Sequence, residues 1–272
     1  MKNLQNLHTH STFCDGIDSP EEMVKIAISK GFDSLGFSGH SPNKYSNYAG
    51  INEERTVAYK KEINRLKSLY GDVFPIFLGL EVEMYSGYKP EGYDYLIGSL
   101  HYLDVGNGEF AGFDRSADVV IDIINKHFSG DGLKFAESYY SQLCRLPEFG
   151  KFDILGHFDI ITKNIELADL FDIGDKRYKN AAFEAIHALK KDIPLFEVNT
   201  GAISRGYRTS PYPTLELLRE FKACGYKAII SSDCHDAKYL DCGFFEAEEM
   251  LKACGFKEKY ILTKRGFEAV PI

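Results

Sequence analysis

The 272-residue chain contains no tryptophan, only nine prolines and no segment of strongly biased composition. Disorder is therefore disfavoured, and the hydrophobic fraction of 44% is typical of a globular protein with a sizeable core. The six cysteines form no CxxC pair and no short-range framework. This pattern argues against a disulfide scaffold and against a thiolate zinc site, so we expect free thiols.

Positive charge is also scarce, because 40 aspartates and glutamates outnumber 32 lysines and arginines and give a net charge of −8. Nucleic-acid binders depend on basic contacts to phosphates, so no nucleic-acid partner is expected. The chain lacks a run of roughly 18 apolar residues, which a membrane span needs. Its first ten residues also lack the apolar core of a signal peptide. We expect a cytoplasmic protein without a membrane partner, and the sequence specifies no oligomeric state.

Short apolar blocks alternate with longer amphipathic segments, which is typical of alternating strands and helices. We predict strands at residues 4–7, 34–38, 74–80, 93–100, 152–156, 194–198 and 227–232, with another short one at 259–262. Helices are predicted at residues 19–29, 52–70, 116–128, 133–146, 176–190, 214–223 and 244–253. No linker or internal repeat divides the chain, so we favour one α/β barrel domain over residues 1–272. A doubly wound open sheet is the alternative, but no GxGxxG follows the first strand.

Six of the eight histidines lie at or just beyond the carboxyl end of a predicted strand. In a parallel barrel these ends open onto one face, so side chains distant in sequence converge there. The LHTH and SSDCH segments each place two donors two residues apart, and such donors point to the same side of an extended strand. His127 and His187 lie inside predicted helices and are expected to be structural. The candidate metal ligands are His8, His10, Asp15, His40, Glu81, His101, His157, Asp233 and His235.

Imidazole and carboxylate donors without thiolates suit Zn, Mn or Fe, and about nine donors exceed what one ion uses. We therefore expect two or three divalent metal ions. Closely spaced divalent ions stabilise the attacking and leaving oxygens in phosphate ester hydrolysis. A single histidine after a strand, such as His40 alone, is more often structural, but six at successive strand ends are hard to explain in that way.

Several assignments within this set have alternatives. Glu81 is preferred to Glu83, which faces the same side of the strand. Asp159 shares the face of His157, where it either orients an imidazole from outside the ligand set or caps the following segment. The proton donor to the leaving group is a metal-bound water, Asp159 or His235.

A phosphate substrate also needs donors from the protein. The loop NTGAISRGYR, after the sixth strand, holds Arg205 and Arg208, and Lys163 follows the fifth strand. Arg205 is the preferred phosphate ligand because a guanidinium binds two phosphate oxygens in a planar fork. The alternative for Arg205 is a solvated charge on a loop.

The motifs HTH, SGH, GLEVE, GSLHYLD, GHFD, EVNTG and SSDCH, together with Asp15, resemble the PHP (polymerase and histidinol phosphatase) superfamily of metal-dependent phosphoesterases over residues 8–235. The stretches GSLHYLD, FAESYYSQL and RGYRTSPYP are similar to monofunctional histidinol-phosphate phosphatases. The resemblance implies a distorted (β/α)7 TIM-like barrel with three metals. It also implies a bridging hydroxide that attacks phosphorus and converts L-histidinol phosphate to L-histidinol and phosphate in histidine biosynthesis.

The resemblance also implies how the ligands are shared. One metal would take His8, His10, Glu81 and Asp233, a second would share Glu81 and take His101 and His157, and a third would take Asp15, His40 and His235. Family members often carry an arginine just after the GHxD strand, where this chain has Thr162 and Lys163. Because histidinol phosphate carries an ammonium and an imidazole, a carboxylate is expected across the pocket, with Asp114 and Glu109 as candidates.

Two other functions fit the same residues. A PHP-type phosphoesterase acting on nucleotides would have identical metal ligands and would differ only in its substrate loops. A non-catalytic metal-binding protein is the alternative from another class, although such a site would normally have lost ligands and none is missing here. A polymerase-linked nuclease is disfavoured by the chain length and the negative charge.

Overall fold

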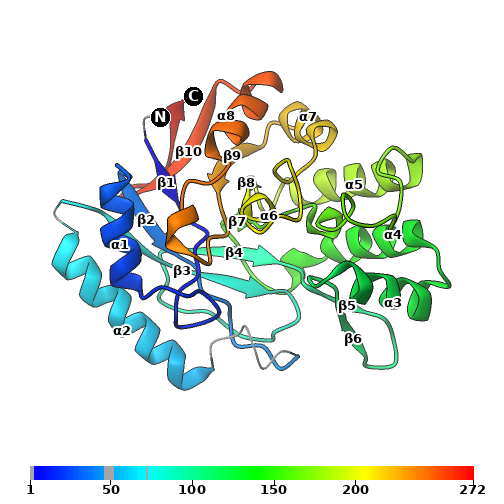
Figure 1. Ribbon diagram of the computed structural model, residues 1–272, viewed down its shortest axis with the longest axis horizontal. Coiled ribbons are helices and arrows are strands. Elements are labelled where there is room, and N and C mark those ends of the chain that lie inside the picture. The colour runs from blue at the N-terminus through cyan, green and yellow to red at the C-terminus, as the bar shows by residue number, and fades with distance from the viewer. Residues whose placement is uncertain (1–2, 46–51, 72) are drawn as a thin grey trace.

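The computed structural model describes residues 3–45, 52–71 and 73–272. Seven parallel strands form the main sheet in the order β1-β2-β3-β4-β7-β8-β9. Their bounds are β1 (Gln5–Asn6), β2 (Ser34–Phe37), β3 (Ile76–Glu83), β4 (Tyr95–Ser99), β7 (Ile154–Leu155), β8 (Leu195–Asn199) and β9 (Lys227–Ser231). A parallel bridge between Thr9 and Cys234 brings the last strand back to the first, so the sheet is nearly closed into a barrel (Figure 1).

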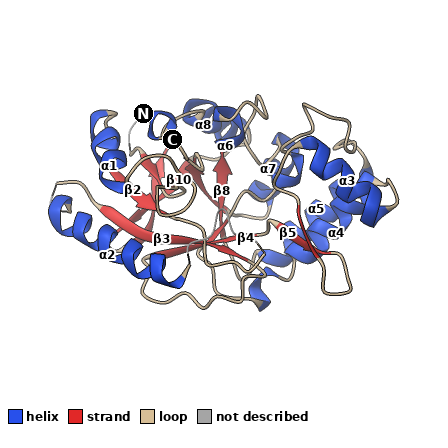
Figure 2. Cartoon of the chain, turned by 60° about the horizontal axis from the view of Figure 1, so that its bottom comes forward, coloured by secondary structure: helices blue, strands red, loops and turns tan. Residues whose placement is uncertain are grey.

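The chain forms longer helices outside the strands and a short helix, α6 (Gly201–Ser204), in the loop after β8. The longer helices are α1 (Pro20–Ser29), α2 (Glu53–Tyr70), α3 (Ala117–Phe128), α4 (Gly132–Leu143), α5 (Lys176–Leu189), α7 (Leu215–Ala223) and α8 (Phe244–Ala253). Figures 1 and 2 show α1, α2, α7 and α8 around the outside of the strands, while α3, α4 and α5 form a group beyond β4 and β5. Within the described ranges, no helix combines the length and the apolar character needed to cross a bilayer.

The local sequence explains where the helices begin. The Ser19 hydroxyl caps α1 by accepting a hydrogen bond from the Glu22 amide. The Glu22 carboxylate in turn accepts a hydrogen bond from the Ser19 amide, which completes a capping box. In α2 the buried residues Tyr59, Ile63 and Leu66 recur at helical spacing and pack inward. The seven helices predicted from the sequence are confirmed as α1, α2, α3, α4, α5, α7 and α8.

Two hairpins extend beyond the predicted elements. β5 (Tyr102–Asp104) and β6 (Phe110–Gly112) pair after β4, and their strands of three residues are too short to show a period of two in the sequence. β10 (Glu258–Thr263) contains the short strand predicted at residues 259–262, but its partner β11 (Gly266–Pro271) was not predicted. β11 is half exposed, so it carries little apolar signal.

The barrel interior is apolar at the end where the strands begin. The buried side chains that fill it are Leu7, Phe77, Tyr95, Ile97, Ile154, Leu195, Ile229 and Leu262. Leu262 comes from hairpin β10–β11, and the Gln5 side chain holds it in place by donating to its carbonyl at 2.8 Å and accepting from its amide at 2.7 Å. The hairpin therefore closes the amino-terminal end of the barrel and leaves the carboxyl ends of the strands for the polar residues.

Candidate metal centre and active site

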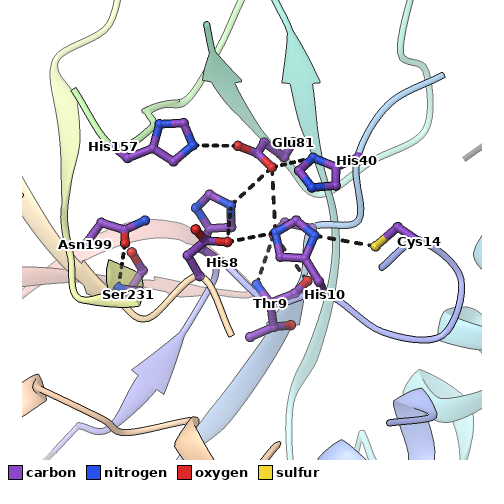
Figure 3. Close-up of polar contacts among 12 residues, drawn as sticks. His8, Thr9, His10, Cys14, His40, Glu81, His157, Asn199 and Ser231 are labelled. Atoms are coloured by element: carbon purple, nitrogen blue, oxygen red, sulfur yellow. Dashed lines mark hydrogen bonds and ion pairs between the residues drawn. The ribbon is translucent and has the colours of Figure 1, made fainter. Parts of the chain in front are cut away.

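Glu81, near the end of β3, lies at the centre of the polar cluster and is 1% exposed. Its Oε1 lies 2.9 Å from His157 Nε2 and 3.3 Å from His101 Nε2. Its Oε2 lies 2.8 Å from His40 Nδ1 and 3.3 Å from His8 Nε2 (Figure 3). One carboxylate therefore contacts imidazoles from the ends of four strands.

The remaining predicted ligands extend this cluster. His10 Nε2 lies 3.1 Å from Asp233 Oδ1. Asp15 Oδ2 lies 3.4 Å from both His40 Nε2 and His235 Nε2. Donor atoms lie within 4.8 Å of one another in three groups: His10, Asp15, His40 and His235; His8, His10 and Asp233; and His8, Glu81 and His157. With His101 beside Glu81, the structure brings together all nine side chains named from the sequence.

The charges of the cluster are mutually dependent. Burial lowers the pKa of His8, but Glu197, Glu81 and Asp233 outweigh burial and raise it well above the usual value. Burial raises the pKa of Glu81, but His8, His40 and His101 outweigh it and hold the pKa well below the usual range. For His10, burial together with His235 and His40 lowers the pKa to about 3, so this imidazole is neutral at physiological pH.

The donor set fits divalent metal ions. His8 Nε2, His10 Nε2 and Glu81 Oε2 are buried, and although charged groups lie close to them, none of these atoms has a partner in hydrogen-bond geometry among the described residues. Such atoms are rare in folded proteins unless an ion or water satisfies them. His101 Nε2 and His157 Nε2 lie only 3.1 Å apart, each close to Glu81 Oε1. Donors on one ion with metal–ligand bonds of about 2.0–2.2 Å have this spacing, so the residues fit a metal centre.

Two carboxylates orient His8 and His101 through contacts to their Nδ1 atoms. Glu197, on β8, is fully buried and its Oε2 lies 2.9 Å from His8 Nδ1. Glu83 accepts from His101 at Nδ1 (2.9 Å) and at the backbone amide (2.8 Å). Sequence reasoning missed both roles, although the strand-end motifs EVNTG and GLEVE contain these residues. Carboxylates that hold the second nitrogen of a ligating histidine are a regular feature of metal sites.

A cavity of about 500 Å³ opens onto the cluster. Arg205 lines it, with Nη2 lying 2.8 Å from Asp233 Oδ2 and Nη1 lying 3.3 Å from His235 Nδ1. The neighbouring carboxylates raise the pKa of Arg205 further, although burial opposes them, so the guanidinium stays charged. The cavity therefore has a fixed cation directly beside the predicted metal ligands.

The lining of the cavity also carries an ion pair. Lys163 Nζ lies 2.6 Å from Asp114 Oδ1 and 4.5 Å from the centre of the Tyr207 ring. All three residues line the cavity, together with Tyr102. Burial raises the pKa of Asp114, but Lys163, His101 and Arg205 outweigh it and lower the pKa to about 2.

The structure does not bring every predicted residue to the cavity. Asp159 is fully buried, but its Oδ1 accepts from the hydroxyls of Tyr140 (3.0 Å) and Tyr178 (2.7 Å), and its Oδ2 accepts from the amide of Thr214 (3.1 Å). It faces the helices and is not among the residues that line the cavity. The predicted catalytic role of Asp159 is therefore corrected to a structural one.

Two further candidates also lie elsewhere. Glu109 sits in the β5–β6 turn, half exposed, where it pairs with Lys126 at 2.6 Å. Arg208 is buried against Thr162 and Ser210 rather than in the cavity. Of the two arginines in the loop after β8, only Arg205 is among the residues that line the cavity.

Comparison of the sequence with known proteins identifies the family of this chain. The sequence model of the PHP domain matches residues 6–201, which is most of the chain. The chain belongs to the PHP domain family. A probable histidinol-phosphatase of Schizosaccharomyces pombe is 26% identical to this PHP chain, over 94% of the chain and 89% of the relative. The histidinol-phosphatase of Lactococcus lactis is also 26% identical, over 95% of the chain and 93% of the relative.

A solved structure shares the fold. The crystal structure of histidinol phosphate phosphatase from Lactococcus lactis, complexed with zinc, L-histidinol and phosphate, matches this PHP chain with a TM-score of 0.74. The match covers 98% of this chain and 99% of that chain at 20% sequence identity. The seven-stranded barrel predicted from the sequence is thus confirmed as the PHP fold.

Proposed function

We propose that this PHP chain is a metal-dependent phosphatase that hydrolyses L-histidinol phosphate to L-histidinol and phosphate in histidine biosynthesis. The observation that carries the proposal is the cluster of imidazole and carboxylate donors around Glu81, which opens onto the same cavity as Arg205. The proposal is supported by relatives named histidinol-phosphatases and by zinc, L-histidinol and phosphate in the structure from Lactococcus lactis.

The residues that would hold two or three divalent ions (Zn, Mn or Fe) are those named from the sequence: His8, His10, Asp15, His40, Glu81, His101, His157, Asp233 and His235. When bound, such ions supply Lewis acidity toward the phosphate and lower the pKa of a coordinated water. Glu81 contributes by holding the imidazoles of four strands around one point. With Asp159 directed elsewhere, Glu81 and His235 are the catalytic candidates that line the cavity.

Arg205 binds the phosphate group in this proposal. Its guanidinium is charged, lines the cavity and lies next to Asp233 and His235, so an anion at the cluster comes within its reach. Asp114, which also lines the cavity, binds the ammonium or the imidazole of the histidinol end in this proposal. Lys163 supports this role by fixing the Asp114 carboxylate at 2.6 Å.

The test is phosphate release by the purified protein, loaded with Mn or Zn, from four substrates: L-histidinol phosphate, AMP, a cyclic dinucleotide and p-nitrophenyl phosphate. We expect kcat/KM for L-histidinol phosphate to exceed the others at least a hundredfold, which corresponds to about 2.7 kcal/mol of transition-state contact. Preference for a nucleotide would shift the function to the nucleotide phosphoesterase alternative. No turnover on any ester, with metal bound, would indicate a metal-binding protein.

A further inference from the structure

A cysteine supports one of the central imidazoles. Cys14 Sγ lies 3.4 Å from His10 Nδ1 (Figure 3). Cys14 belongs to a tight turn in which the amides of Cys14 and Gly16 both donate to the Ser11 carbonyl, at 2.9 and 3.1 Å. A Cβ at Gly16 would lie 2.4 Å from the His10 carbonyl carbon, so only glycine lets the turn pack this closely. The turn thus directs Cys14 back toward His10.

His10 connects two of the donor groups, since it belongs both to the group with Asp15 and to the group of His8 and Asp233. Its Nε2 faces the latter group, 3.1 Å from Asp233 Oδ1, and has no hydrogen-bond partner among the described residues. The ring is fully buried. A neutral imidazole carries one proton, so Nε2 offers its lone pair to an ion only when that proton is on Nδ1.

The acceptor for the Nδ1 proton differs among the histidines. His8 and His101 each face a carboxylate, Glu197 and Glu83, at 2.9 Å. His10 Nδ1 faces the sulfur of Cys14 at 3.4 Å and Asp15 Oδ1 at 3.5 Å. Asp15 also lies against His40 and His235 and belongs to their donor group. Asp15 faces His40 and His235 through Oδ2, and its Oδ1 makes no hydrogen bond to His10 Nδ1. Among the described residues, the Cys14 sulfur is therefore the hydrogen-bond partner of His10 Nδ1.

We propose that Cys14 is a positioning residue whose sulfur accepts a hydrogen bond from His10 Nδ1–H and thereby directs His10 Nε2 into the group of His8 and Asp233. This inference rests on the metal centre of the proposed function. Cys14 acts through His10 and touches neither substrate nor ion. Unlike His8 and His101, whose Nδ1 atoms face carboxylates, His10 faces the weaker sulfur acceptor at Nδ1.

The test measures zinc affinity of the full metal-stripped chain by competition with a chelating dye. We expect Cys14→Val, which replaces the thiol by methyl groups and removes the acceptor, to weaken binding of one zinc equivalent about tenfold or more. Cys14→Ser keeps an acceptor and should retain most of the affinity. Cys144→Ala, at the end of α4 and far from the cluster, is the matched control and should bind zinc as the wild type does.

A second measurement shows whether the effect passes through His10. On a His10→Asn background, Cys14→Val should cause no further loss, because the two residues act as one unit. Equal losses on both backgrounds, or wild-type zinc affinity in Cys14→Val, would overturn the proposal. A sulfur-to-cobalt charge-transfer band that requires Cys14 would also overturn it, by making Cys14 a ligand.

Two checks keep the result interpretable. Thermal unfolding of the metal-stripped variants reports folding separately, and if Cys14→Val does not fold, Cys14→Ala takes its place with the same expected loss. None of these readouts uses substrate. A wild-type protein that binds zinc but hydrolyses no ester would therefore contradict the proposed function and still leave the role of Cys14 open to this test.

Discussion

Glu197, which orients His8, has several hydrogen-bond partners at the cluster. Besides His8 Nδ1, it accepts from the His157 amide (2.5 Å), Asn199 Nδ2 (2.9 Å) and Ser231 Oγ (2.6 Å). Burial raises the pKa of Glu197, but His8 and its other donors outweigh burial and lower it, so the group is an anion surrounded by donors. The single carboxylate thereby holds both the ring of His8 and the backbone at His157 in place.

Replacing Glu197 with Gln changes an acceptor into a donor at one of its two oxygen positions. We expect Glu197→Gln to weaken zinc affinity about 10- to 100-fold and to reduce the free energy of unfolding by about 1–3 kcal/mol. Dye competition and urea unfolding measure the two effects. Glu184→Gln, on the exposed face of α5, is the control and should change neither. Unchanged zinc affinity in Glu197→Gln would show that Glu197 has no part in orienting His8.

Asp114 provides a test of substrate recognition. We expect Asp114→Asn to raise KM for L-histidinol phosphate and to leave p-nitrophenyl phosphate hydrolysis nearly unchanged, since only the former carries a cation. Lys163, His101 and Arg205 outweigh burial and lower the pKa of Asp114 to about 2, so the carboxylate is ionised throughout the neutral range. The ratio of the KM of the variant to that of the wild type should therefore show no pH dependence from Asp114 between about pH 5 and 8.

The control for this prediction is Glu109→Gln, which alters a carboxylate in the β5–β6 turn that is not among the cavity-lining residues. It should leave KM for both substrates unchanged. An equal loss on both substrates in Asp114→Asn would remove Asp114 from the binding role.

At the scale of elements, the strand ends explain both what the sequence predicted and where it failed. A period of two holds only while the backbone stays extended. Thr9, between His8 and His10, forms a parallel bridge with Cys234, and both histidines meet the same cluster. After β7 the chain turns at Phe158 and enters a 3-10 helix at Ile160–Thr162, so Asp159 leaves the face of His157. The roles of Glu197 and Glu83 depend on contacts across strands, which residue spacing along one strand does not reveal.

Hairpin β10–β11 provides a prediction at the same scale. Leu262 fills the amino-terminal end of the barrel, so Leu262→Ala should leave a cavity and reduce the free energy of unfolding by about 2–5 kcal/mol. Leu167→Ala, at a residue 57% exposed, should change it little. Because the metal cluster lies at the other end of the barrel, folded Leu262→Ala should bind zinc with wild-type affinity. Urea unfolding with wild-type stability would show that the hairpin does not contribute to the core.

In the molecule as a whole, the apolar core and the polar cluster lie at opposite ends of the barrel. Its amino-terminal end is closed by apolar side chains, and its carboxyl end gathers buried histidines and carboxylates. Strand-end histidines predicted this division, because a parallel barrel places all such ends on one face. Cations bound in the cluster would also explain how a chain with a net charge of −8 attracts a phosphate ester.

We expect the strand-end cluster to bind the ions on which phosphate ester hydrolysis depends. The most direct measurement strips the protein with a chelator and titrates Zn or Mn back while following phosphate release from L-histidinol phosphate. We predict that activity disappears with the metal and returns in proportion to two or three bound equivalents, and that His10→Asn binds less metal and turns over more slowly. Full turnover by the metal-free protein, or normal metal content and turnover in His10→Asn, would contradict the account.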